Sequence, residues 1–284
     1  MGEGTTARRA VPAGAGRNRP GSAATPPCVE WDGARYDEVA APQTRWGLAV
    51  LDRLELDGSE TVLDAGCGSG RVTEALLERV PAGRVVALDA SASMLEQAKA
   101  RLERFGARVR LVRADLLELG PKDLDVEWPV DAVFSTATFH WVTDHDRLFG
   151  NLAGVLRPWG QLVAQCGAEG NVERLIAAVR SLGVERAGTW LYASPAETAL
   201  RLERAGFVDV HVWSHAEPTA FPSDVAFVDF LETVCLREHL ATLAPDRRRR
   251  FAEDVATVMG DTTIDYVRLN IVARRGDRAP GGGS

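Results

Sequence analysis

A carboxylate stands directly before a loop that has glycine at every second position. Asp64 ends a short apolar run. The loop after it contains Gly66, Gly68 and Gly70. Residues 71–79 then have the apolar spacing of a helix. A strand, a glycine loop and a helix in this order begin a βαβ unit, and the loop of such a unit lies at a sheet edge that commonly binds a nucleotide-like ligand.

The spacing of these glycines excludes two common nucleotide sites. The dinucleotide fingerprint needs a third glycine where this chain has Arg71 or Thr73. The phosphate-binding pattern that ends in Gly-Lys-Ser/Thr is not present at this loop either. A carboxylate at the loop mouth repels a pyrophosphate but suits a ligand with an ammonium group. The motif therefore predicts an S-adenosylmethionine site, with a glycine-rich turn that binds no ligand as the alternative.

Two further predicted strands of the same sheet also end in a carboxylate. Residues 84–88 lead to Asp89, and residues 109–114 lead to Asp115. Because the carboxyl ends of parallel strands share one edge, Asp64 and these two acids would line one site. An ionised Asp89 can accept both hydroxyls of a ribose, and Asp115 can accept from an adenine amine. Met94 would add an apolar contact to the adenine.

These motifs resemble those of class I S-adenosylmethionine-dependent methyltransferases of the methyltransferase-11 and -25 type. The resemblance covers about residues 60–165 and includes 87–91, 113–116 and 155–160. In the last stretch, Trp159 replaces a glycine of the family's Arg-Pro-Gly-Gly pattern. The resemblance implies S-adenosylmethionine as the cofactor. The implied cofactor-binding residues are Asp64, Gly66, Gly68, Gly70, Asp89, Ala90, Met94, Asp115, Leu116 and Thr136.

Less specific stretches are similar to the trans-aconitate 2-methyltransferase group. They are residues 31–46, 137–145, 204–207 and 268–275. This similarity implies O-methylation of a carboxylate such as trans-aconitate, although fold analogy alone cannot fix a substrate. A methyltransferase that acts on a natural-product phenol, a carbon acid or a carrier-bound acid is one alternative. A cofactor-binding regulator without turnover is another.

The acceptor pocket is expected beyond the fourth strand, where His140 falls. This histidine could act as a base, donate to a substrate carboxylate or simply pack at the strand end. Helices before the first strand often lid the pocket in folds that this chain resembles, and packing on the core is the alternative for their aromatic residues. The expected substrate residues are Tyr36, Trp46, His140, Trp141 and Arg268, with His140 as the catalytic candidate. Gln43, Trp190, Tyr192 and Trp213 are weaker candidates.

The alternation of strands and helices predicts an α/β fold. We expect a doubly wound, Rossmann-like seven-stranded sheet that is mostly parallel with an antiparallel last strand. The predicted strands are 61–65, 84–89, 109–114, 131–136, 161–165, 208–213 and 266–273. A helical insertion separates the last two strands and includes one helix from Ser223 to about Leu243. A capping box at Ser93 is expected to open a helix that ends at Gly106.

One domain accounts for the chain. Residues 28–276 are predicted to form it, with 60–165 as the cofactor-binding core and 166–276 as the substrate side. The first 27 residues are rich in Gly, Ala, Pro and Arg, and they have too few large apolar residues to offset their chain entropy. We expect disordered tails at 1–27 and 277–284.

Composition narrows the range of partners. The formal net charge is −7, and the one run of four arginines, Arg247–Arg250, has acids beside it in a helical pattern, so no nucleic-acid partner is expected. No apolar run has the length of a membrane span. The cysteines have no metal-ligand spacing, so we expect no metal and reduced thiols; they are Cys28, Cys67, Cys166 and Cys235. A cytoplasmic enzyme with a small-molecule substrate fits best, and the oligomeric state is left open, with a monomer as one option.

Overall fold

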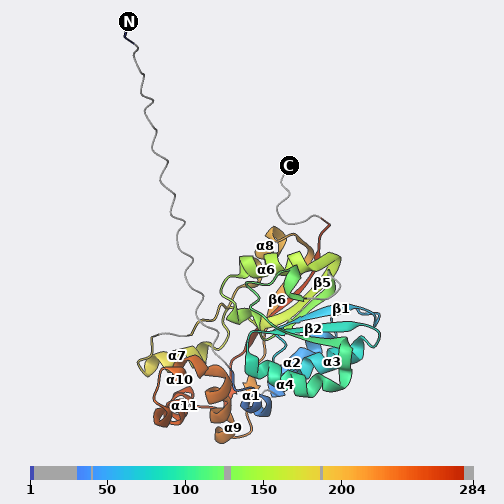
Figure 1. The fold of residues 1–284 in the computed structure, drawn as a ribbon. Coiled ribbons are helices and arrows are strands. Elements are labelled where there is room, and N and C mark those ends of the chain that lie inside the picture. The colour runs from blue at the N-terminus through green and yellow to red at the C-terminus, as the bar shows by residue number, and fades with distance from the viewer. Residues whose placement is uncertain (3–30, 40, 125–128, 186–187, 278–284) are drawn as a thin grey trace.

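A seven-stranded sheet forms the centre of the described part of the chain (Figure 1). The computed structural model describes residues 1–2, 31–39, 41–124, 129–185 and 188–277. The strand order is β3-β2-β1-β4-β5-β9-β6. The strands are β1 Thr61–Ala65, β2 Arg84–Asp89, β3 Val109–Arg113, β4 Val130–Thr136, β5 Leu156–Gly167, β6 Phe207–Ala216 and β9 Val267–Arg275. Nearly all of the two predicted tails, together with Cys28, lies outside the described residues.

Within this sheet β9 is antiparallel to both of its neighbours, β5 and β6, while the other described pairs are parallel. The predicted fold class is therefore confirmed. From β1 the chain builds β2 and β3 on one side and then β4 and β5 on the other. The order reverses between β1 and β4, and ligands bind such sheets at the carboxyl ends beside that point.

Alternating side chains of β1 bury the two faces of the sheet. Val62 packs in a cluster with residues of α2 (Ala41–Leu51), α3 (Arg71–Arg79) and α4 (Ala92–Leu102). Leu63 points to the other face and packs with residues of α6 (His145–Val155) and α8 (Pro195–Arg204). Helices thus cover both faces and hold the strand ends in place.

A group of helices beside the sheet has a hydrophobic core of its own, and we call it the cap (Figure 1). This core joins Trp46 of α2 and Tyr266, which precedes β9, to the cap helices. Those helices are α7 Glu173–Ser181, α9 Asp224–Phe230, α10 Arg237–Ala241 and α11 Pro245–Met259. The short strands β7 (Thr219–Ala220) and β8 (Thr263–Ile264) pair next to it. The remaining described α-helices are α1 Gly33–Val39 and α5 Pro121–Leu124, and short 3₁₀ helices lie at Glu103–Arg108 and Phe139–Trp141.

Three predicted helix boundaries are wrong. The expected continuous helix from residue 223 to 243 is divided into α9, a π-helical turn at Leu231–Cys235, and α10. The extra residue of the π turn rotates the next turn, and Leu236 and Leu240 remain buried in the cap core.

The N-terminal cap of α4 lies two residues before Ser93, where the capping box was expected. The N-cap of α4 is Ser91, whose Oγ accepts from the Met94 amide at 3.3 Å. The Ser93 hydroxyl instead donates to the Trp31 carbonyl of the preceding segment. The helix also ends at Leu102, before a 3₁₀ turn that contains Gly106.

Candidate active site

Two features of the glycine loop require glycine: its backbone angles and the closeness of neighbouring side chains. Gly66, Gly68 and Gly70 have φ angles of 88°, 55° and 81°, in the left-handed region that glycine adopts most readily. A Cβ on Gly66 would lie 2.1 Å from Oγ1 of Thr138. The amide of Gly66 donates to the Leu88 carbonyl at 2.8 Å. The loop is therefore fixed between the ends of β2 and β4.

Asp89 connects the glycine loop to β2. Its Oδ2 accepts from the Gly68 amide and its Oδ1 accepts from the Ser91 amide, each at 2.9 Å. An ionised carboxylate only accepts hydrogen bonds, which suits the two hydroxyl donors of a ribose. Asp89 thus lies where a ribose diol could bind beside the loop.

Asp64 is a buried carboxyl group, with 2 % of its surface exposed. Its Oδ2 accepts from the Thr73 hydroxyl of α3 at 2.7 Å. Burial raises the pKa of Asp64 to about 7; the hydrogen bond from Thr73 opposes that shift, and the charge of Asp89 adds to it. Without a ligand the group is therefore partly protonated near neutral pH, and a nearby cation would favour its ionised form.

The other predicted cofactor residues lie at or just beyond the same strand ends. Asp115 follows β3, is exposed, and accepts from the Leu117 amide at 2.9 Å. Met94 and Leu116 are buried, with 3 % and 5 % exposed. Ala90 follows β2 and Thr136 ends β4, and both are half-buried. The structure thus brings the predicted set to one edge of the sheet.

An ionic clamp holds α1 against the glycine loop. The Asp37 carboxylate accepts from the Ser69 hydroxyl, from Arg71 Nε at 2.8 Å and from Arg101 Nη2. Arg101 also donates from Nε to the Ser69 carbonyl at 3.0 Å. Burial alone would raise the pKa of Asp37, but the hydrogen bonds from Ser69 and Arg71 and the charge of Arg101 hold it below its usual value.

On the other side of the site, Arg268 is a buried cation that faces Gly167 of β5 across the sheet. Its exposed fraction is 3 %. Its Nε donates to Gln165 Oε1 at 3.3 Å, and its guanidinium lies 4.5 Å from the ring centre of Trp46. Among the described residues no carboxylate forms an ion pair with Arg268, and the hydrogen bond to Gln165 uses Nε alone. The two Nη nitrogens are not among the buried polar atoms there that lack a partner, so they keep some access to solvent. Burying a cation without a counter-charge is costly, so Arg268 is a candidate to bind an anionic ligand.

His140 lies close to this cation. It is 8 % exposed, and its Nδ1 accepts from the Gly167 amide at 3.3 Å, which leaves the ring proton on Nε2. Burial, together with the charge of Arg268, lowers the pKa of His140 to about 3. The ring is therefore neutral at physiological pH, a weak base but a competent hydrogen-bond donor.

Five aromatic side chains form a continuous surface next to His140, which we call the aromatic wall. Its members are Trp31, Tyr36, Trp141, Trp190 and Tyr192. Neighbouring ring centres are 5.3 to 5.9 Å apart, and the wall meets the His140 ring through Trp141 at 5.2 Å and Tyr192 at 5.8 Å. The wall can exclude water from a ligand bound there.

The structure does not bring every candidate to this place. Trp213 lies on the edge strand β6, 39 % exposed, with Arg53 over its ring at 5.1 Å. Sequence analysis missed Thr138 and Gln165. Gln165 ends a predicted strand, and Thr138 follows one, so position at the carboxyl edge was the signal that could have found them.

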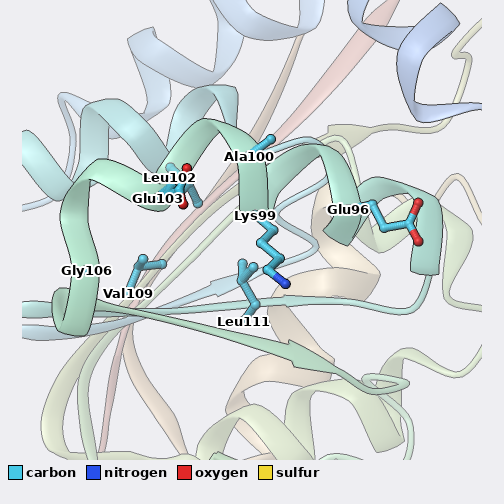
Figure 2. Close-up of a pocket in the computed structure, with 8 residues that line it drawn as sticks. All are labelled: Glu96, Lys99, Ala100, Leu102, Glu103, Gly106, Val109 and Leu111. Carbon is cyan, nitrogen blue, oxygen red and sulfur yellow. The ribbon is translucent and has the colours of Figure 1, made fainter.

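A separate groove lies outside this site (Figure 2). It has a volume of about 600 Å³ and is lined by Glu96, Lys99, Ala100, Leu102, Glu103, Gly106, Val109 and Leu111. These residues come from α4, the turn after it, and the edge strand β3. Because Val109 begins β3, the groove reaches the amino end of that strand, opposite the predicted cofactor residues.

Two classes of feature are missing from the described ranges. No group of three or more His, Cys, Asp or Glu side chains there could hold a metal ion. None of the helices in the described part of the chain is long and apolar enough to cross a membrane.

Comparison with known proteins places this geometry in a family. A protein-family model described as a methyltransferase domain matches residues 62–160. The trans-aconitate 2-methyltransferase of Azoarcus sp. (strain BH72) is 31% identical over 229 residues, which cover 76% of this chain and 84% of the relative. The enzyme of the same name from Methylobacterium radiotolerans is 28% identical over 266 residues, 87% of this chain and 99% of the relative.

Solved structures agree on the fold. Phosphoethanolamine N-methyltransferase 2 of Haemonchus contortus, solved with S-adenosylhomocysteine, superimposes with a TM-score of 0.58 at 17% identity. That alignment covers 86% of this chain and 57% of the solved chain. The chain therefore belongs to the S-adenosylmethionine-dependent methyltransferases, in the family that includes the trans-aconitate 2-methyltransferases.

Proposed function

We propose that this methyltransferase forms a methyl ester on a small polycarboxylic acid, with trans-aconitate as the first candidate. The observation that carries the proposal is Arg268, a buried guanidinium without a carboxylate partner in the described residues. It lies beside His140 at the edge where the glycine loop ends. The names of the relatives support the same class of acceptor.

We assign the cofactor to the carboxyl ends of β1 to β4. Asp89 accepts from the ribose, Asp64 balances the ammonium group, and Asp115 faces the adenine. Met94, Leu116 and Ala90 supply apolar contacts to the adenine and ribose, and Thr136 lies beside the methionine part. In the loop, a Cβ on Gly68 would point into open space, so its absence lets a ligand approach the backbone closely, whereas Gly66 and Gly70 avoid contacts with neighbouring side chains of the protein.

Methyl transfer requires little of the protein beyond alignment of the acceptor with the methyl group. The cofactor supplies a sulfonium methyl group that is already electrophilic. A carboxylate is ionised at neutral pH and needs no base, which agrees with the weak basicity of His140. The aromatic wall excludes competing water. One acceptor oxygen gains a C–O bond to the methyl group, and the electron pair of the broken C–S bond stays on sulfur.

The position of Arg268 favours an acid with more than one carboxylate. A cation bound to the attacking oxygen would weaken it as a nucleophile, so Arg268 is best used on a carboxylate that does not react. The Nε2 proton of His140 can then orient the second carboxylate. A phenol would instead need a base, and His140, with its pKa near 3, is poorly suited to that task.

The test uses methyl-labelled S-adenosylmethionine with a panel of acids and phenols, read by mass spectrometry. We expect product from polycarboxylates, and we expect Arg268→Gln to raise the KM for the acid about 100-fold with an unchanged Kd for S-adenosylhomocysteine. Arg104→Gln, which removes the ion pairs of an exposed arginine with Glu74 and Glu78, is the matched control.

Two other outcomes of this assay would contradict the proposal. Product only from phenols or carrier-bound acids would discard the polycarboxylate reading and keep the cofactor. Cofactor binding without any product would support a regulator.

A further inference from the structure

We propose that a closed chain of side chains behind the active site positions Arg268 for the acceptor. This relay consists of Gln165, Asn270, His215, Glu217 and Trp46. The inference rests on the proposed role of Arg268 in binding an acid. It assigns a positioning function to residues of β6 and β9 that lie outside the methyl-transfer site.

Three neighbouring strands place the relay on one face of the sheet. Asn270 of β9 lies opposite Gln165 of β5, and Arg268 lies opposite both Gly167 of β5 and His215 of β6. Asn270 and Arg268 are two residues apart, so their side chains share a face. That proximity allows direct hydrogen bonds between the three strands.

Asn270 sets the direction of the relay. It is fully buried, and its Oδ1 accepts from Gln165 Nε2 at 2.9 Å and from Arg53 Nη1 at 2.6 Å. Two donors on the oxygen fix the orientation of this amide, so its Nδ2 faces the other way. Gln165 must then present Nε2 to Asn270 and Oε1 to Arg268, whose Nε donates to it at 3.3 Å.

The amide nitrogen of Asn270 extends the relay to the edge strand. Its Nδ2 lies 3.0 Å from Nδ1 of His215, which must accept because the amide can only donate. Because Nδ1 accepts, the ring proton is on Nε2, 3.4 Å from Oε2 of Glu217.

Trp46 closes the circuit. Oε1 of Glu217 accepts from Trp46 Nε1 at 3.3 Å, and the Trp46 ring centre is 4.5 Å from the Arg268 guanidinium. Arg268 is therefore held along its Nε edge by Gln165 and across its flat face by Trp46. The two Nη groups remain for the acceptor, in an orientation that the whole relay defines.

The experiment replaces His215, a partly exposed member of the relay that lies away from the reacting atoms. His215→Phe keeps a ring but removes the acceptor for Asn270. His215→Asn restores an oxygen close to the position of Nδ1. The control is His211→Phe on the same strand, because His211 is exposed and makes no side-chain hydrogen bond within the described residues.

We expect His215→Phe to raise the KM for the acid about tenfold, with a smaller change in kcat and an unchanged Kd for S-adenosylhomocysteine. His215→Asn should return the KM to within about threefold of the unmodified enzyme, and His211→Phe should leave it unchanged. An unchanged KM in His215→Phe would overturn the proposal, and so would a failure of His215→Asn to restore it.

A second readout does not depend on the acceptor. In protein with ¹⁵N-labelled arginine, the Nε–H resonance of Arg268 is assigned by its loss in Arg268→Gln. His215→Phe should shift that resonance and increase its exchange with solvent, and His215→Asn should restore it. An unshifted resonance contradicts the relay even if no acid proves to be a substrate, whereas a shift without acid turnover leaves the relay standing and rejects the proposed acceptor.

Discussion

Burial makes Asp64 a group that titrates near neutral pH, with a pKa of about 7 in the ligand-free protein. If the cofactor's cationic end binds beside it, the bound state favours the carboxylate and lowers that pKa. Binding must then release protons, and affinity must rise as the pH increases through about 7. Calorimetry of S-adenosylhomocysteine binding in two buffers of different ionisation enthalpy measures the release. Binding without proton release between pH 6 and 8 would contradict the assignment.

The burial of Asp64 also predicts that a neutral residue at this position stabilises the ligand-free protein but weakens cofactor binding. Because the folded-state pKa of Asp64 is raised, the stability that its protonated form contributes is present below about pH 4 and is lost as the pH rises through about 7. Asp64→Asn stays neutral. It should increase the ligand-free free energy of unfolding at pH 8 by about 1–3 kcal/mol and weaken cofactor binding. Urea unfolding with and without S-adenosylhomocysteine separates the two effects.

His140 gives a prediction about pH dependence. With a pKa of about 3 the ring is neutral throughout the physiological range, so kcat for an acid should show no inflection from this group between pH 5 and 8. His140→Ala removes a donor and part of the pocket lining, and should lower kcat/KM about 10- to 100-fold. An inflection near pH 6–7 that disappears in this variant would restore the general-base role.

At the scale of elements, the Asp37 clamp decides how firmly α1 covers the glycine loop. Asp37→Asn loses the charge that both Arg71 and Arg101 share. Since these side chains are partly exposed, we expect a cost of about 1–2 kcal/mol, seen as weaker S-adenosylhomocysteine binding and faster deuterium exchange in α1. Arg104→Gln should have a smaller effect. The pKa of Asp37 is lowered, so the clamp's contribution is present at neutral pH and is lost as acid protonates the carboxylate.

The irregular turn within the first part of β5, between Leu156 and Gln161, contains a second element-scale feature. Trp159 has a φ of 64° and is 52 % exposed. Trp159→Gly and Trp159→Ala both remove the indole, but only glycine adopts this backbone without strain. The glycine variant should exceed the alanine variant by about 1 kcal/mol in free energy of unfolding, as measured by urea titration. Equal stabilities would show that the turn rearranges.

The elements that were predicted best from the sequence are those whose own residues mark where they begin and end. β1 and β2 begin and end where expected, because short apolar runs stop at an acid or glycine. The π turn at Leu231–Cys235 was missed because burial against the cap, and not any local residue pattern, selects it. The same limit applies to the site. The acids that end three successive strands could be recognised in the sequence. The contact between Trp46 and Arg268, by contrast, joins residues that only the folded sheet brings together.

At the scale of the whole molecule, the candidate site lies where the hydrophobic core of the cap meets the sheet. The cap has its own hydrophobic cluster, which includes Tyr266, and the chain passes from there directly into β9 and Arg268. Trp46 belongs to the cap cluster and also contacts Arg268. An acid bound to Arg268 would therefore contact the cap and the sheet together, and its binding should stabilise the cap against local opening.

Deuterium exchange measures this coupling region by region. S-adenosylhomocysteine alone should protect the glycine loop and α1, because the predicted cofactor residues and the Asp37 clamp lie there. Adding a polycarboxylate should further protect α7 and α9–α11, while α6 on the opposite face serves as the internal control. Arg268→Gln should keep the first effect and lose the second, because it removes the cation that joins the acid to the cap side. If the acid protected the cap equally in this variant, it would have to bind elsewhere, and the coupling through β9 would be rejected.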